Sequence, residues 1–248
     1  MAHIRCDFRS ESLDMGTSMT VILPEGIKGK DCNVVYLLHG LADNCTGWVR
    51  YTSVERYARM KNLALVIPEV QRSFYTDMDY GLKYYTFIHN ELPRLCSNMF
   101  GFSNKRDKTY IMGLSMGGYG ALKCVFDTPH RYAGCAAFSA VTDLSSVIKE
   151  ANTGRENEFR AIFGPRVNLG RKEDLLKALE TLDAKSLPRF YLACGTEDGF
   201  IEQDRMLAEK LSEIGADTIF ESWKGIHGWE FWDEAVRRAF EYFFNEKE

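Results

Sequence analysis

Four short, uninterrupted apolar runs constrain the fold of this chain more than any other feature of its sequence. They lie at 34–38, 63–67, 109–112 and 190–194. Strands that are apolar throughout are typical of a sheet buried on both faces, as parallel sheets are. Weaker strand patterns occur at 133–138 and 218–221, and an opening antiparallel pair is predicted at 4–9 and 19–23, closed by a turn at 24–26.

Helical patterns lie between these runs. Tyr84, Phe87, Ile88, Leu92 and Leu95 recur every three or four residues and form one apolar face. Pro93 falls inside this pattern and should kink the helix or start a new turn. Further helices are predicted around 121–126 and 232–243. Strands that alternate with helices predict βαβ crossovers, and therefore an α/β fold of three layers around a mostly parallel sheet.

The chain shows no internal repeat and no low-complexity linker, so we expect residues 1–248 to form a single domain. The segment 141–186 interrupts the alternation because it is polar and partly helical. It is either a small cap over a functional site or a surface excursion of helices, and the sequence does not decide between them.

Charge and cysteine content narrow the possible partners. The 31 basic and 35 acidic residues give a net charge of −4 with no basic stripe, which argues against a nucleic-acid partner. No apolar run approaches the roughly 20 residues that cross a bilayer, and the charged N-terminus does not resemble a signal peptide. The seven scattered cysteines include no C-x-x-C pair, which favours free thiols over a disulfide framework or a metal site. We therefore expect a cytoplasmic protein without a membrane partner or a metal.

The motif Gly113-Leu114-Ser115-Met116-Gly117 carries the strongest chemical signal. G-x-S-x-G alone is weak, but here it follows an apolar strand and precedes a helix, as a nucleophile elbow requires. The tight turn projects the serine hydroxyl beyond the sheet, and the glycines avoid collisions with neighbouring backbone. Ser115 is the predicted nucleophile.

A serine hydroxyl needs a base, and His227 is the best placed of the five histidines. It lies in a loop between the last predicted strand and the last helix, which fits the chain order Ser–acid–His. The loop after the 190–194 strand supplies the acid. Asp198 is preferred over its neighbour Glu197 because it lies deeper in the loop and precedes a glycine, and Asp143 is a more distant alternative.

The oxyanion of a tetrahedral intermediate needs preorganised donors. The backbone N–H of Met116, directly after the nucleophile, is one candidate. The N–H of Leu41, in the loop that Gly40 opens after the 34–38 strand, is the other. His39 could be an alternative base, but it abuts the strand, and a structural role beneath this loop is the preferred interpretation.

The combined motifs resemble one family. They are Leu37-Leu38-His39-Gly40, Thr46-Gly47-Trp48, Tyr75-Thr76-Asp77, Glu91-Leu92-Pro93, Gly113 to Gly120 and His227-x-Trp229. Over nearly the whole length, the chain resembles the tributyrin esterase group of the esterase D family, which is related to S-formylglutathione hydrolases and to acetyl and feruloyl esterases.

The resemblance implies an α/β-hydrolase fold with an eight-stranded sheet, no cofactor and no metal. It also implies hydrolysis of short-chain acyl esters, a small-molecule ester as the partner, and possible homo-oligomers. It places the nucleophile, base and acid on Ser115, His227 and Asp198. S-formylglutathione hydrolase or feruloyl esterase activity is the main alternative, and a non-catalytic hydrolase-fold binding protein is a further one.

Several residues are candidate walls of the substrate pocket. Gly40, Trp48, Tyr75 and Trp229 are predicted to contact the substrate, with Tyr80 and the 141–186 segment nearby. Cys45, beside the predicted oxyanion loop, is either a packed cysteine or a site of sensitivity to thiol reagents.

Overall fold

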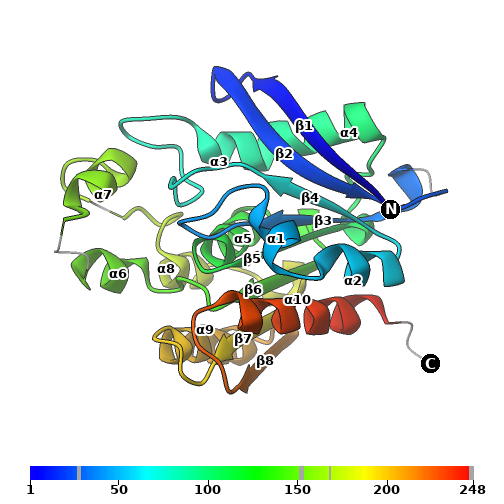
Figure 1. The fold of residues 1–248 in the computed structure, drawn as a ribbon. Coiled ribbons are helices and arrows are strands. Elements are labelled where there is room, and N and C mark those ends of the chain that lie inside the picture. The colour runs from blue at the N-terminus through cyan, green and yellow to red at the C-terminus, as the bar shows by residue number, and fades with distance from the viewer. Residues whose placement is uncertain (27–28, 151–153, 168, 246–248) are drawn as a thin grey trace.

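The computed structural model describes residues 1–26, 29–150, 154–167 and 169–245. Within these residues, the strands form one eight-stranded sheet in the order β1-β2-β4-β3-β5-β6-β7-β8 (Figure 1). The strands are β1 (Ala2–Ser10), β2 (Met15–Leu23), β3 (Asn33–Leu38), β4 (Leu63–Pro68), β5 (Thr109–Leu114), β6 (Gly134–Phe138), β7 (Arg189–Gly195) and β8 (Thr218–Trp223). Strands β3 to β8 pair in parallel, and β1 and β2 join antiparallel at one edge.

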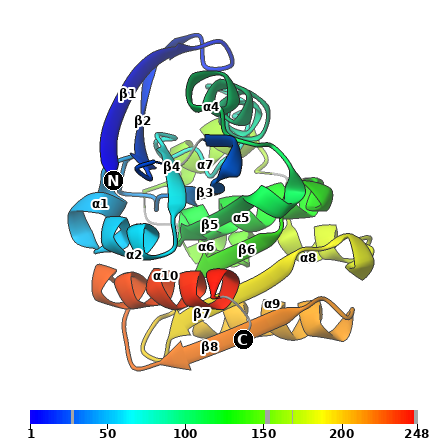
Figure 2. The same cartoon turned by 90° about the vertical axis from the view of Figure 1, so that its right-hand side faces the viewer.

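Helices cover both faces of the sheet (Figure 2). The α-helices are α1 (Gly47–Tyr51), α2 (Val54–Met60), α3 (Tyr84–Thr86), α4 (Leu92–Phe100), α5 (Met116–Asp127), α6 (Leu144–Glu150), α7 (Glu156–Phe163), α8 (Leu175–Leu179), α9 (Ile201–Glu213) and α10 (Trp229–Phe244). Single 3-10 turns occupy Gly29–Asp31, Arg106–Lys108, Pro129–Arg131 and Ala184–Ser186. Helices α1, α2 and α10 pack on one face, and α4, α5, α8 and α9 pack on the other.

Alternation along the central strands explains the two cores. In β3, Val34, Tyr36 and Leu38 pack into the core beneath α5, whereas Val35 and Leu37 pack into the core beneath α10. Successive side chains of a strand point to opposite faces, so a strand buried on both faces must be apolar at every position. The predicted three-layer α/β fold is confirmed.

One local expectation needs correction. Strands β1 and β2 are longer than expected, and the turn at 11–14 joins them. The predicted turn at 24–26 instead follows β2. Pro93 starts a new turn, which is one of its two predicted effects: a π-helical turn (Phe87–Glu91) precedes α4 and places the proline in the first turn of that helix. Proline has no backbone N–H to donate, and the first turn is the part of an α-helix where that missing donor costs least.

The 141–186 segment contains α6, α7 and α8. Helices α6 and α7 lie beyond the edge of the sheet at which the parallel strands end (Figure 1). No helix among the described residues is both long and apolar enough to cross a bilayer.

Candidate active site

Ser115 stands between the end of β5 and the start of α5. Its backbone is left-handed, with φ 51° and ψ −117°, and a residue with a side chain is strained in that region. The neighbouring glycines permit the turn. A Cβ on Gly113 would lie 2.3 Å from the carbonyl oxygen of Gly117, and one on Gly117 would lie 2.4 Å from that of Leu38. The predicted elbow is therefore present in its full backbone form.

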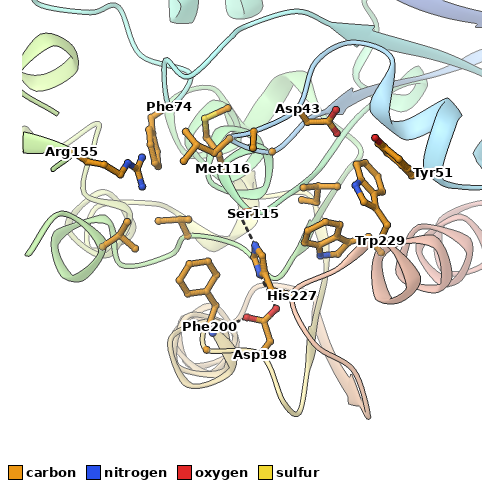
Figure 3. Close-up of a pocket in the computed structure, with 18 residues that line it drawn as sticks. Asp43, Tyr51, Phe74, Ser115, Met116, Arg155, Asp198, Phe200, His227 and Trp229 are labelled. Carbon is orange, nitrogen blue, oxygen red and sulfur yellow. Dashed lines mark hydrogen bonds and ion pairs between the residues drawn. The ribbon is translucent and has the colours of Figure 1, made fainter. Parts of the chain in front are cut away.

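His227 and Asp198 approach Ser115 from two other loops, which lie like Ser115 at the carboxyl ends of the parallel strands. His227 Nε2 lies 3.1 Å from Ser115 Oγ, and His227 Nδ1 lies 2.9 Å from Asp198 Oδ2 (Figure 3). The parallel strands β5, β7 and β8 end at this edge, which brings together residues 112 positions apart. The predicted serine, histidine and aspartate thus form one hydrogen-bonded chain.

The surroundings of Asp198 and His227 determine which atoms carry the protons in the Ser115–His227–Asp198 hydrogen bonds. Burial alone would raise the pKa of Asp198, but hydrogen bonds from His227 and from the Phe200 N–H outweigh it and hold that pKa below its ordinary value. An ionised Asp198 accepts a bond from Nδ1–H, so Nε2 is left as the acceptor for the serine hydroxyl. The rings of Phe200 and Trp232 meet the imidazole edge-on, at 5.1 and 4.9 Å. The arrangement can remove a proton from Ser115.

His39 organises the loop that carries Leu41. Its Nε2 accepts a bond from the Val70 N–H at 3.1 Å, so Nδ1 must carry the proton and donates to the Gly40 carbonyl at 2.7 Å. The Asp43 N–H donates to the same carbonyl at 3.3 Å. In a trans peptide the N–H points opposite to the C=O, so this anchoring turns the Leu41 N–H away from His39. His39 therefore has the structural role preferred above, and burial lowers its pKa.

A cavity of about 730 Å³ opens over Ser115, and Leu41 and Met116 both line it. Met116 is the first residue of α5, so its N–H has no acceptor within the helix. Figure 3 shows Arg155 and Phe74 on one side of Ser115 and Asp43, Tyr51 and Trp229 on the other. The remaining walls are mostly apolar and are formed by Gly40, Ala42, Leu114, Val141, Val147, Gly199, Phe200 and Trp232.

Two of the four predicted substrate contacts are wrong. Gly40 and Trp229 line the cavity, whereas Trp48 and Tyr75 are fully buried behind its walls. The Trp48 indole donates to the Leu38 carbonyl at 3.1 Å, and the Tyr75 hydroxyl donates to the His39 carbonyl at 2.9 Å. Both side chains support the loop after β3 from within the core. Tyr80 is largely exposed and does not line the cavity.

The alternative residues have other environments. Glu197 is exposed, and Asp143 accepts bonds from the N–H and hydroxyl of Ser146 at the start of α6. Cys45 is buried, and burial raises the pKa of its thiol, which disfavours the reactive thiolate. These environments support Asp198 as the acid and Cys45 as a packed cysteine.

Sequence reasoning missed residues that shape the site from its periphery. Phe200, two positions after Asp198, contributes both its ring and its N–H to the site. Ser139 has a left-handed backbone (φ 46°) directly after β6; its hydroxyl accepts a bond from Trp232 Nε1 at 3.2 Å and helps to lower the pKa of Asp198. The position of Ser139 at the end of a buried strand, at the same edge as Ser115, was the available signal.

The fold and this geometry define a class, the serine hydrolases with the α/β-hydrolase fold. Comparison with known proteins assigns the chain to a family within this class. Residues 10–243 match the model of the Esterase family, described as "Putative esterase", and the chain belongs to that family. It is 30% identical to an acetyl esterase of Caldicellulosiruptor saccharolyticus, over 98% of both chains.

Solved structures agree with this assignment. The fluorophosphonate-binding serine hydrolase FphF of Staphylococcus aureus is 31% identical, with a TM-score of 0.89 over 99% of both chains. S-formylglutathione hydrolase (FrmB) from the same organism is also 31% identical, with a TM-score of 0.88 over 98% of this chain and 99% of that one. A ferulic acid esterase at 22% identity shares the fold, with a TM-score of 0.84. The chain is thus a carboxylic-ester hydrolase, and its resemblance to the esterase D group is supported.

Proposed function

We propose that the protein is a serine carboxylesterase that cleaves acetyl to butyryl esters of carbohydrate or phenolic alcohols through Ser115, His227 and Asp198. The observation that carries this proposal is the chain of two hydrogen bonds from Ser115 Oγ through His227 to Asp198, at 3.1 and 2.9 Å. The similarity to an acetyl esterase supports the acyl group.

In the proposed cycle, His227 takes the proton of Ser115 while the serine oxygen attacks the ester carbonyl. The N–H groups of Leu41 and Met116 stabilise the oxyanion, and His227 then gives the proton to the departing alcohol. Water activated by the same histidine attacks the acyl-serine and releases the acid. Asp198 holds the imidazole in the required tautomer and stabilises its charged form.

A thioester substrate is the second candidate. Thioesters and esters pass through the same acyl-serine, so the residues of this site serve both. The 31% identity to S-formylglutathione hydrolase over almost the whole chain supports this candidate.

A substrate panel tests the proposal. It compares 4-nitrophenyl esters of two to ten carbons, acetylated oligosaccharides, methyl ferulate, short-chain glycerides and formylglutathione. We expect the highest kcat/KM at two to four acyl carbons, and a kcat lower by at least ~10³ for Ser115→Ala, since that change removes the nucleophile.

Labelling with a fluorophosphonate probe is the control: the wild type should label and Ser115→Ala should not. A chain that neither labels nor hydrolyses any of these compounds would be a non-catalytic hydrolase fold. A preference for acyl chains of eight carbons or more would contradict the proposed acyl range.

A further inference from the structure

Three charged side chains meet where the 141–186 segment contacts the rest of the fold. Glu158, on α7, accepts bonds from Arg72 Nε at 2.5 Å and from Arg155 Nε at 2.7 Å. The two guanidinium groups are always charged, and their bonds to Glu158 lower its pKa against the opposing effect of burial. Two cations and one carboxylate leave one positive charge without a partner inside this cluster.

Arg155 brings that charge to the cavity. It lines the cavity that opens over Ser115, whereas Arg72 does not (Figure 3). Its guanidinium lies over the ring of Phe159 at 4.9 Å, and Phe159 packs against Phe74, itself a cavity wall, at 5.8 Å. The aromatic support limits the positions that the guanidinium can adopt.

One nitrogen of Arg155 lacks an acceptor. Its Nη2 is shielded from solvent and makes no hydrogen bond within the part of the chain that the structure describes. A shielded, unsatisfied N–H group is costly, and a charged one more so. An acceptor supplied from the cavity would remove that cost. Arg72 already neutralises Glu158, so the ion pair with Glu158 does not require Arg155.

We propose that Arg155 binds an anionic group, such as a carboxylate, on the ester substrate, at the opposite side of Ser115 from Asp43. The inference rests on the proposed esterase function and adds the charge of the substrate to it. Asp43, also a wall of the cavity, would repel an anion bound on its own side. A guanidinium matches a carboxylate well because it can present two parallel N–H groups.

Two matched ester pairs test the proposal and distinguish the part of the substrate that carries the charge. In the first pair, 4-acetoxybenzoate and its methyl ester differ in charge on the alcohol. In the second, mono-4-nitrophenyl glutarate and its methyl ester differ in charge on the acyl group. For each pair, kcat/KM of the charged ester is divided by that of the neutral ester, after subtraction of spontaneous hydrolysis. The two esters of a pair differ in intrinsic reactivity, but this difference is the same for every variant and cancels when the ratios of two variants are compared.

We expect Arg155→Gln to lower this ratio at least about tenfold for one of the two pairs, the loss typical of a charge-assisted hydrogen bond. Arg155→Lys should fall between it and the wild type, because lysine keeps the charge but loses the paired donors. Arg72→Gln is the matched comparison: Arg155 stays in the cavity but becomes the only cation bonded to Glu158, so the ratio should fall less than it does for Arg155→Gln.

Equal ratios in wild type and Arg155→Gln for both pairs would overturn the proposal. If Arg155→Gln fails to fold by circular dichroism, inhibition of the wild type decides instead. 4-Hydroxybenzoate or glutarate should then inhibit more strongly than its methyl ester, and stronger inhibition by both neutral compounds would overturn the proposal. Failure of the esterase function itself is seen separately, as no hydrolysis of the neutral esters by the wild type.

Discussion

The carboxylate of Asp198 is almost completely buried, yet its pKa lies below the ordinary value. Burial would raise this pKa, and the bonds from His227 and from the Phe200 N–H reverse the effect. A group whose pKa is depressed in the folded state stays ionised at neutral pH, and its contribution to stability is lost only as the pH falls through that depressed value. The partner of His227 is therefore an anion at neutral pH.

Replacing this anion by a neutral amide should disable the site without unfolding it. We expect Asp198→Asn to lower kcat by about 10³- to 10⁴-fold, because the amide no longer fixes the proton of His227 on Nδ1. The control is Glu197→Gln, one residue earlier, which removes an exposed carboxylate. Steady-state kinetics on 4-nitrophenyl acetate gives both values. A strong loss for Glu197→Gln with little loss for Asp198→Asn would move the acid to Glu197.

For single residues, the sequence predicts the catalytic side chains better than it predicts which side chains line the cavity. Ser115, His227 and Asp198 follow from motif and chain order, since each ends or follows a strand at one edge of a parallel sheet. Trp48 and Tyr75 were misplaced because proximity to a motif does not tell whether an aromatic ring faces the cavity or the core. Arg155 was missed because its position depends on how the 141–186 segment packs against the loop that holds Arg72.

Helix α5 lies close to the elements beneath it because three of its first five residues are glycines. Met116 is followed by Gly117, Gly118 and Gly120. A Cβ on Gly120 would lie 2.4 Å from the ring of Tyr75, whose hydroxyl holds the His39 carbonyl. The helix that begins at the nucleophile and the loop that carries Leu41 are thus packed through one buried tyrosine.

We expect Gly120→Ala to destabilise the protein by about 1–3 kcal/mol, because the added methyl group must displace a ring that is fixed at both ends. Gly16→Ala, on the exposed start of β2, is the matched control, since a Cβ there meets nothing within 4 Å. Urea unfolding of both variants measures the difference. Equal urea midpoints for the two variants would contradict the prediction and show that the Tyr75 ring moves aside at little cost.

The elements themselves were largely predictable. The apolar runs predicted the central strands, because both faces of these strands are buried and nearly every position is therefore apolar. Features set by tertiary packing were not predictable, namely the 11–14 hairpin turn and the π-helical turn before Pro93. All eight strands had a candidate segment in the sequence, and β8 gave one of the weaker patterns because it lies at the open edge of the sheet and is only half-buried.

Across the whole molecule, burial suppresses the ionisation of thiols and phenols. Burial raises the pKa of all seven cysteines, to about 12 for Cys96 and Cys124. The same effect raises the pKa of Tyr36, Tyr75, Tyr119 and Tyr132. A group whose pKa is raised by folding adds stability below its unfolded pKa, and that stability is lost as the pH rises above it. The fold should therefore weaken in alkali.

We expect the free energy of unfolding to fall steeply above about pH 9, by up to ~1.4 kcal/mol per pH unit for each thiol that ionises only on unfolding. Urea unfolding in reductant at pH 7.5, 9 and 10 measures the slope. Joint replacement of Cys124 and Cys135 by alanine should make the slope shallower. A midpoint that stays constant from pH 7.5 to 10 would contradict the prediction.

The 112 positions that separate His227 from Ser115 have a consequence for the order of folding. The loop after β5 can form from local sequence, but the imidazole arrives only when β8 has paired with β7 at the far edge of the sheet. Contacts between distant parts of a chain form slowly, because the loop-closure entropy must be overcome first. Catalytic competence is therefore a late event in folding, and a chain that has collapsed without this edge strand holds an unactivated serine.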